Sequence, residues 1–185
     1  MLSQTYTEKG EIMDLRIVKT KNQIKEAFLK LRDKMMPEKI KVKDICDVAM
    51  INKTTFYKHY TDSFELSNEI EECAIEKVIA SLKNKNNILT QPQEYISGLM
   101  NALKAEAANL QLVFKGKYDV LSVKLTDKLL KLSDASAETP ENEVRLSFAI
   151  GGFVRIVNDY MFTNKNFDLE KLTMHTVTML EAIPF

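Results

Sequence analysis

Apolar residues recur at intervals of three and four along most of the chain, and this spacing predicts an all-helical protein without strands of useful length. The first clear stripe consists of Ile24, Ala27, Phe28, Leu31 and Met35. The sequence TKNQ, which begins at Thr20, predicts a capping box at the start of this helix, and Pro37 predicts its end. Residues 1–15 have no clear period, so we expect a loose N-terminal arm there.

Two short helices are expected next, over residues 42–49 and 53–60, joined by the turn Met50-Ile51-Asn52. The later helices are expected over residues 63–83, 90–109, 110–114, 118–132, 140–163 and from 169 onward. Asp62, with Glu65 three residues later, predicts a capping box at the start of the first of these helices. Helix 140–163 has little polar surface, so we expect other helices to cover it on more than one side. The last helix carries a narrow apolar stripe, close to the seam of a coiled coil.

The composition agrees with a helical protein and excludes several classes. The 185 residues include only five Gly and four Pro, and 45% are hydrophobic, enough for one medium domain or two small ones. No apolar run reaches the roughly 18 residues that a membrane span needs, and the first residues do not have the pattern of a secretory signal. We therefore expect a cytoplasmic protein that makes no membrane contact.

The reactive residue types give no indication of an enzyme. The sequence has no Ser/His/acid set, no glycine-rich phosphate loop and no paired His ligands, so we expect no catalytic residue, no metal and no cofactor. Cys46 and Cys73 form no CxxC pattern, and we interpret both as buried free thiols, with redox sensing as the alternative. His175 is expected at the surface or in an interface.

The charges are unevenly distributed, although the whole chain has a formal net charge of zero. Residues 1–62 contain 13 Lys and Arg against 9 Asp and Glu, a net charge of +4. Residues 63–185 contain 13 against 17, a net charge of −4. This asymmetry indicates that one end of the molecule contacts a nucleic acid or another polyanion.

Residues 42–60 have the dimensions of a helix-turn-helix. The small Cys46 suits the place where the two helices cross. The expected buried face consists of Ile45, Val48, Ala49, Ile51, Phe56 and Tyr60. The opposite face of the second helix offers Thr54, Thr55, Tyr57, Lys58 and His59. Threonine and tyrosine hydroxyls suit base edges and phosphates, threonine methyls suit thymine methyls, and the cations suit phosphates, while Asn52 is a good N-cap.

The segment IKVKDICDVAMINKTTFYKHYTDSFEL, residues 40–66, resembles the DNA-binding domain of the tetracycline-repressor (TetR) family of bacterial transcription regulators. The resemblance covers about residues 16–66. It implies an all-helical homodimer with a helix-turn-helix domain at residues 16–62 and a ligand-binding and dimerisation domain at residues 63–185. In this family the last two long helices form a four-helix interface with the partner subunit.

The resemblance implies particular DNA contacts. Those expected first are made by Lys43, Thr55, Tyr57 and His59, and those expected next by Thr54 and Lys58. The positions expected to add contacts to the phosphate backbone are Arg16, Lys41, Asn52 and Lys53.

Three positions depart from the family pattern. Met50 occupies the turn position that is usually Gly, and it costs roughly 1 kcal/mol if φ is positive there. Lys41 replaces the usual Thr that caps the first helix of the motif, and lysine has no acceptor for this role. Ser63 replaces a Lys near the start of the following helix, so one phosphate contact is expected to be missing.

We therefore expect a ligand-responsive dimeric repressor that binds a double-stranded DNA operator. Two reading helices would enter successive major grooves, roughly 34–36 Å apart. The alternatives are an activator or co-regulator on the same fold, and a protein-interaction module that has lost DNA binding.

The C-terminal helices supply candidates for the effector pocket and for the dimer interface. The candidates for the pocket, whose effector is a small molecule of unknown identity, are Met100, Leu103, Phe114, Tyr118 and Phe148. The pair Gly151-Gly152 costs a helix interior roughly 1–2 kcal/mol, and close approach of another helix is the usual reason for such a pair. We assign the pair to dimer packing, with an internal contact on the ligand side as the alternative. The candidate interface residues are Ser147, Gly151, Arg155, Leu172, Thr176 and Leu180.

Overall fold

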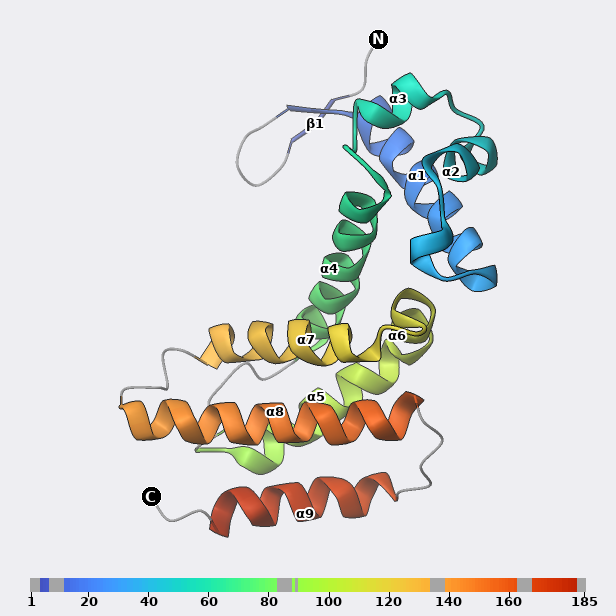
Figure 1. Ribbon diagram of the computed structural model, residues 1–185. Coiled ribbons are helices and arrows are strands. Elements are labelled where there is room, and N and C mark those ends of the chain that lie inside the picture. Colours follow the sequence, from blue (N-terminus) through green and yellow to red (C-terminus); the bar gives the residue numbers. More distant parts are fainter. Residues whose placement is uncertain are drawn as a thin grey trace. The chain divides into compact units, whose positions relative to one another are not determined.

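The computed structural model describes residues 4–6, 12–82, 88, 90–133, 139–162 and 168–182. The chain forms two compact units, Met1–Ile70 and Glu71–Phe185. Apart from strands β1 (Gln4–Tyr6) and β2 (Ile12–Asp14), the regular structure that is described is helical, which confirms the expected fold class (Figure 1). These two strands pair antiparallel, with Thr5 opposite Met13. The expectation of a loose arm without strands was therefore wrong for these residues, because three-residue strands are too short for alternation to be recognised.

The N-terminal unit contains three helices and the first part of a fourth (Figure 1). These are α1 (Leu15–Lys34), α2 (Val42–Ala49), α3 (Lys53–Tyr57) and α4 (Ser63–Ser81), with the short 3-10 helix η1 (Pro37–Lys39) between α1 and α2. The residues that form its core include Ile24, Phe28, Ile45, Phe56, Tyr60 and Leu66, all of which are almost completely buried. Their spacing on each helix is the helical spacing seen in the sequence.

The start of α1 differs from the expectation. The capping box predicted at Thr20 is wrong, because α1 already begins at Leu15 and Thr20 lies inside it. Its hydroxyl donates to the carbonyl oxygen of Arg16 over 2.8 Å. The apolar residues of the first turn, Leu15 and Ile17, are exposed and do not pack in the core. They therefore do not continue the apolar stripe from which the start of the helix was predicted.

A buried arginine lies at the other end of α1. Only 1% of the Arg32 surface is exposed, and its Nη1 atom donates to the carbonyl oxygen of Met35 over 3.0 Å. The guanidinium therefore satisfies a backbone oxygen just beyond the helix end, near Pro37, where the helix was expected to stop. A charged residue in the apolar stripe was not expected from the sequence.

The C-terminal unit continues α4 and adds five helices (Figure 1). These are α5 (Pro92–Ala105), α6 (Ala107–Phe114), α7 (Tyr118–Ser133), α8 (Pro140–Phe162) and α9 (Leu169–Ala182). Helix α7 packs on α8, and α5 packs on α9. Two side chains cap the last helices: the Thr139 hydroxyl accepts from the Asn142 N–H, and the Asp168 carboxylate accepts from the Glu170 N–H.

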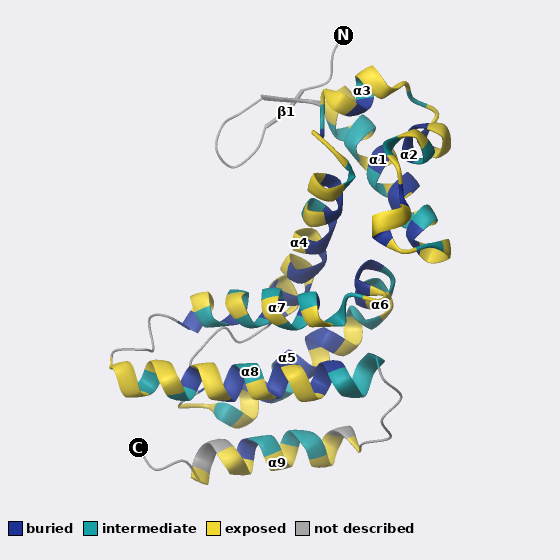
Figure 2. Cartoon of the chain, in the orientation of Figure 1, coloured by how far each residue is buried: buried dark blue, intermediate teal, exposed yellow. Residues whose placement is uncertain are grey.

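Among the described residues, helix α8 is covered on one side and exposed on the other. Its buried residues include Leu146, Ile150, Phe153, Val154 and Val157. Its exposed apolar residues are Val144, Phe148 and Ile156, with 70%, 75% and 41% of their surfaces exposed. Buried and exposed residues alternate along this helix (Figure 2). The expectation that this helix is covered on more than one side is therefore not met within the described residues of the single chain.

Charged side chains join α4 to α7 in the C-terminal unit. Glu71, almost fully buried, pairs with Lys117 and, over 3.0 Å, with Lys124. Lys124 also contacts Glu72 over 3.0 Å, and Lys128 pairs with Glu76. We call these residues, Glu71, Glu72, Glu76, Lys117, Lys124 and Lys128, the α4–α7 ion-pair row. Burial alone would raise the pKa of Glu71, but the hydrogen bonds and charges of its two lysines outweigh burial and lower this pKa.

Candidate nucleic-acid interface

Helices α2 and α3 form a helix-turn-helix. Helix α2 covers the residues predicted for it, whereas α3 ends at Tyr57, before the predicted end at Tyr60. The predicted N-cap is confirmed, because the Asn52 Oδ1 atom accepts from the Thr55 N–H over 2.7 Å. The carbonyl oxygen of Phe56 accepts from the N–H of His59, so the chain turns immediately after the helix.

The turn between the two helices is strained at one residue. Met50 has φ 53° and ψ 44°, the left-handed conformation, as the departure from glycine suggested. A non-glycine residue pays roughly 1–2 kcal/mol in this conformation. The N–H groups of Met50 and Ile51 both donate to the carbonyl oxygen of Cys46, which closes the end of α2.

The start of α2 is capped by a residue that the sequence analysis missed. Lys41 does precede the helix, but the side chain that caps there belongs to Asp44, whose carboxylate accepts from the Lys41 N–H over 3.2 Å. This is the reciprocal half of a capping box, and the acidic residue at the third helical position was the signal for it.

The inner face of α3 is held by aromatic rings. Phe56 is fully buried, and its ring contacts the rings of Tyr57, at 5.6 Å between centroids, and Tyr60, at 5.8 Å. The Lys21 ammonium lies 5.1 Å from the centre of the Tyr60 ring, a cation–π contact from α1. Tyr60 thus links α1 to the segment after α3, a link that periodicity alone did not indicate.

Glu69 on α4 anchors α1 and was not singled out from the sequence. Its carboxylate pairs with Lys21 over 3.0 Å and with Lys25 over 2.8 Å. Burial would raise the pKa of Glu69, but the hydrogen bonds from and the charges of these two lysines lower it overall. The spacing of the two lysines, one helical turn apart, was the available signal.

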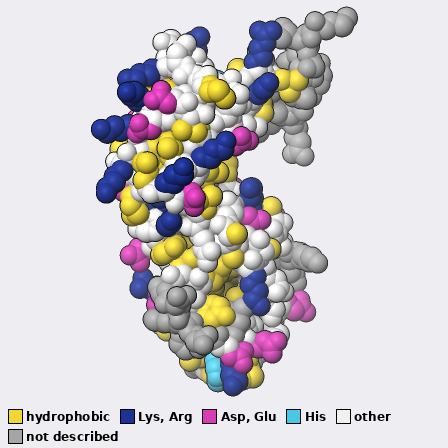
Figure 3. All heavy atoms as spheres, turned by 90° about the vertical axis from the view of Figure 1, so that its right-hand side faces the viewer, with side chains coloured by type: hydrophobic (Ala, Val, Ile, Leu, Met, Phe, Trp, Pro, Cys, Tyr) yellow, Lys and Arg dark blue, Asp and Glu magenta, His cyan; other side chains and the backbone are white. Residues whose placement is uncertain are grey.

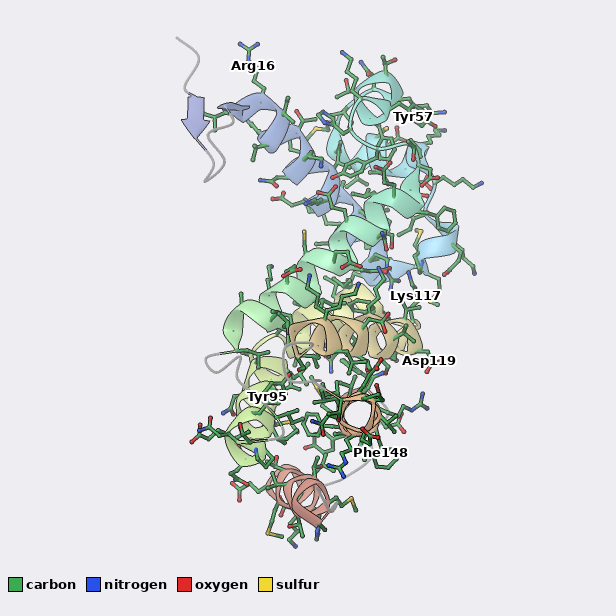
Figure 4. The ribbon with its side chains drawn as sticks, turned by 90° about the vertical axis from the view of Figure 1, so that its left-hand side faces the viewer. Arg16, Tyr57, Tyr95, Lys117, Asp119 and Phe148 are labelled. Carbon is green, nitrogen blue, oxygen red and sulfur yellow. The ribbon has the colours of Figure 1, made fainter. Side chains whose placement is uncertain are left out.

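The outer face of the motif is polar and basic. The predicted contact residues that are exposed are Arg16, Lys41, Lys43, Asn52, Lys53, Thr54, Tyr57 and Lys58, and those that are half-buried are Thr55 and His59. Among the described residues, no carboxylate forms an ion pair with Lys43, Lys53 or Lys58. Arg16 and Tyr57 project outward, and Lys and Arg side chains gather on this unit (Figures 3 and 4). The structure thus leaves Lys43, Lys53 and Lys58 available to an anionic partner.

Two expectations about this motif need correction. Val48 was expected in the buried face, but 37% of its surface is exposed, because it lies on the outer side of a helix of only eight residues. At the start of α4, Asp62 accepts from the N–H groups of Phe64 and Glu65, as expected for a cap. Glu65, however, accepts from the N–H of Thr61 over 2.6 Å instead of from that of Asp62.

The effector candidates lie in different surroundings. Met100, Leu103 and Phe114 are buried in the C-terminal unit, and the Tyr118 ring stacks on that of Phe162 at 4.4 Å. Phe148 does not face the interior: it lies on the exposed side of α8 (Figure 4). The expectation that Phe148 lines an internal pocket is therefore wrong for the single chain, because neighbouring apolar positions on α8 fill the core instead.

A groove of about 350 Å³ lies between α5 and α9. The residues that line it are Gln93, Ser97, Met100, Asn101, Lys104, Glu170, Thr173 and Met174. Met100 is the only predicted pocket residue among them. Most of the lining side chains are polar, a class of residue that an apolar periodicity does not reveal.

The interface candidates are mostly accessible. Ser147 and Arg155 are exposed, and Arg155 pairs with Asp119 over 2.9 Å, while Leu172 and Thr176 are half-buried. The side chain of Leu180 lies outside the described residues.

The glycine pair on α8 has two different environments. A Cβ atom on Gly151 would lie 3.9 Å from the Thr126 methyl of α7, an ordinary contact, and one on Gly152 would meet nothing within 4 Å. Close packing within the subunit therefore does not require either glycine.

The remaining candidate chemistry is limited. Cys46 is buried, and burial, with help from Asp47, raises the pKa of its thiol. Cys73 is exposed on α4, so its assignment to the core was wrong.

Within the part of the chain that the structure describes, no three His, Cys, Asp or Glu side chains are grouped to hold a metal ion. None of the described helices has the length and apolar character that crossing a membrane demands.

Comparison with solved structures identifies the fold. A transcriptional regulator of the TerR/AcrR family from Aquifex aeolicus VF5 aligns with a TM-score of 0.60 and 22% identity, over 89% of this chain and 99% of that one. The dihydroxyacetone kinase operon activator DhaS aligns with a TM-score of 0.53 and 22% identity, over 89% and 96%. The fatty acid degradation regulator FadR from Bacillus halodurans aligns with a TM-score of 0.51 and 14% identity, over 89% and 95%. No protein-family model and no curated protein sequence matches the chain. The chain therefore has the fold of these regulators.

Proposed function

We propose that this protein, which has the fold of helical transcription regulators, binds double-stranded DNA through α3 and acts as a homodimer that responds to a small molecule. The observation that carries the proposal is the exposed polar face of the helix-turn-helix, where Lys43, Lys53 and Lys58 have no carboxylate partner among the described residues. In this proposal residues 16–62 form the DNA-binding domain and residues 63–185 form the ligand-binding and dimerisation domain.

The side chains around α3 would have different roles on DNA. Thr54, Thr55 and Tyr57 offer hydroxyl groups to base edges and phosphates, and the threonine methyls suit thymine. Lys58 and His59 at the end of the helix, together with Arg16, Lys41, Lys43, Asn52 and Lys53, contribute contacts to the sugar–phosphate backbone. The backbone contacts make affinity strongly salt-dependent, whereas the base contacts select the sequence.

The exposed stripe on α8 supports the homodimer. Val144, Phe148, Gly152 and Ile156 follow one another at intervals of four and form one ridge, exposed in the single chain. An exposed apolar ridge of this kind is typical of an interface. The open space beside Gly152 allows the backbone of another helix to come close. A symmetric dimer would also match two reading helices to a near-palindromic operator.

The α5–α9 groove is our candidate effector site. Asn101 and Gln93 offer amides, Ser97 and Thr173 offer hydroxyls, and Lys104 and Glu170 offer opposite charges. Together with Met100 and Met174, this lining suits a small molecule that carries both polar and apolar groups. Such an effector lowers operator affinity only by the difference between its affinities for the two states of the protein.

Screening small molecules by thermal shift, with Asn101→Ala as the comparison, tests this site: a hit that persists unchanged in Asn101→Ala binds elsewhere.

DNA binding is tested by selecting duplexes from a random pool and from the DNA upstream of the protein's own gene, at low salt. We expect the wild type to retain a specific sequence and the Tyr57→Phe/Lys58→Ala variant to bind it more weakly, with the fold intact by circular dichroism. Lys131→Ala on α7 is the matched control for loss of one exposed lysine. Failure of the wild type to select any duplex contradicts the proposal and favours a protein-interaction module.

The sign of regulation needs a separate experiment. We favour a repressor, whose binding blocks transcription until the effector is present. DhaS, which shares the fold, is described as an activator, and this supports activation as the alternative. A reporter gene placed behind the selected operator distinguishes the two, because deletion of the regulator raises expression under repression and lowers it under activation.

A further inference from the structure

The turn between α2 and α3 contains an unusual residue that folding does not explain. Met50 is the sole non-glycine residue with positive φ among those described. L-residues other than glycine adopt this conformation at a cost in free energy, and asparagine or aspartate does so more easily than methionine. A methionine in this position therefore needs a reason.

The fold makes no use of the Met50 side chain. Its surface is 91% exposed, the highest value among the exposed large apolar residues. What the turn requires is supplied by the backbone: the N–H groups of Met50 and Ile51 both donate to the carbonyl oxygen of Cys46. Glycine would make the same hydrogen bonds without the steric strain.

The position of Met50 connects it with the DNA-binding face. It lies two residues before Asn52, which caps α3, and three before the exposed Lys53. Strained residues that persist without a structural benefit occur mainly at functional sites. The methionine side chain is long, unbranched and polarizable, so it adapts to an irregular apolar surface. In the DNA major groove, the apolar group available for contact is the C5-methyl of thymine.

We propose that Met50 is a specificity-determining residue that contacts a thymine methyl at the edge of the operator site. This inference rests on the DNA-binding function proposed above. The strain in the turn is retained because the left-handed conformation aims the thioether out of the protein and toward the groove. Affinity for DNA and stability of the fold thus impose opposite demands on this residue.

The experiment uses the full-length protein and its selected operator. Met50→Gly removes both the strain and the side chain, so we expect the midpoint of thermal unfolding to rise. Operator affinity should fall about four- to fifteenfold, the effect of losing one or two buried methyl-sized contacts. Met50→Asn, which tolerates the left-handed conformation, should show the same loss of affinity. Met50→Leu keeps an apolar side chain and should retain most of the affinity.

Replacing single thymines of the operator by deoxyuracil then locates the contact. At one thymine in each half-site, removal of the methyl group should weaken the wild type and leave Met50→Gly unaffected. Glycine and asparagine variants that bind the operator as tightly as the wild type overturn the role of Met50 while leaving the proposed function intact. A wild type that selects no DNA overturns the proposed function itself, and the contact with it.

Discussion

Two regions of the molecule use lysine in opposite ways: the surface around α3, and the contact between α4 and α7. Around α3, Lys43, Lys53 and Lys58 are exposed and make no ion pair with the described carboxylates. Lys117, directly before α7, and Lys124 and Lys128 on α7 each face a glutamate of α4. Residue counts gave the two ends of the chain different net charges. The roles of the individual lysines, however, differ according to whether each forms an ion pair with a carboxylate. Unpaired lysines are available to release counterions from DNA, whereas paired and partly buried lysines hold helices together.

The largest effect should come from Phe56→Ala. This variant tests whether the unpaired lysines can bind DNA only when α3 is packed on the domain. Phe56 is the only buried residue of α3. We expect a loss of about 3–5 kcal/mol in the free energy of unfolding, because a fully buried aromatic ring leaves a cavity. Chemical denaturation measures this loss, and operator binding should disappear with it. Retention of full affinity would mean that α3 is held by something else.

Phe148→Glu should have the next largest effect, and it acts on the other unit. A charge in the centre of an apolar ridge should weaken the dimer about 100-fold or more, as expected for a hot-spot position. Light scattering measures the mass, and the monomer should bind the operator poorly because one reading helix contacts only half of the site. Val123→Glu on α7, which also replaces an exposed apolar residue, is the control. An unchanged dimer would place the interface away from α8.

Glu71→Ala should cost about 1–3 kcal/mol of stability, because it leaves two partly buried lysines without their shared partner. Glu76→Ala is the matched control in the same ion-pair row. Its side chain and that of Lys128 are 53% and 34% exposed, so this loss should stay below about 1 kcal/mol. Urea unfolding of both variants measures the difference. Equal losses would show that burial does not distinguish the two pairs.

The same row predicts a pH dependence. The pKa of Glu71 is lowered in the folded protein, so its stabilising effect is present above the unfolded value, about 4.3, and is lost as the pH falls through the folded value. Burial would lower the pKa of Lys124, but Glu71 and Glu72 outweigh it and raise this pKa. That contribution is present below the unfolded value, about 10.4, and is lost as the pH rises through the folded value. The stability difference between wild type and Glu71→Gln should therefore be constant between these limits and shrink toward acid. A difference that stays constant at low pH would contradict the pairing.

Lys58→Ala should have the smallest effect on stability and a clear effect on DNA binding. Removing one phosphate contact should reduce the slope of log affinity against log salt by about 1, with similar weakening on all sequences. Lys128→Ala, from the ion-pair row, should leave that slope unchanged. Equilibrium DNA-binding titrations at several salt concentrations give the slope for each of the two variants. If both variants changed the slope equally, the contrast between unpaired and paired lysines would not describe DNA binding.

The sequence predicted the helices well where apolar spacing and local caps agreed. Helix α2 begins and ends at the predicted residues: the Asp44 carboxylate accepts from the Lys41 N–H at its start, and Met50 adopts the left-handed conformation at its end. Asn52 caps α3 as expected. Helices α5 to α9 appear close to their predicted positions, since most of their buried residues follow the 3.6-residue period. The all-helical fold followed from these signals and from the resemblance of residues 40–66.

What the sequence did not predict depends on contacts between distant residues. Arg32 looked like a surface residue, yet the loop after α1 gives its guanidinium a carbonyl partner. Phe148 and Phe153 lie on the same helix, and periodicity alone does not say which of them faces the core. The pairing of Glu69 with Lys21 and Lys25, and that of Glu71 with α7, joins positions that are far apart along the chain or on separate helices. The spacing of Lys21 and Lys25 indicates that both can meet one carboxylate, but the sequence does not say which carboxylate that is.

The shortness of α3 has a consequence for how such a protein acquires new targets. A helix of five residues is far below the length that is stable alone in water, so a peptide copied from it would be unstructured and would bind DNA weakly. Within the domain, Phe56 is the buried residue of α3, and the Asn52 side chain caps the helix. The neighbouring positions are therefore open to exchange, and a new recognition sequence is reachable through a few surface substitutions, provided that the whole segment from α2 to Tyr60 is transplanted as one piece.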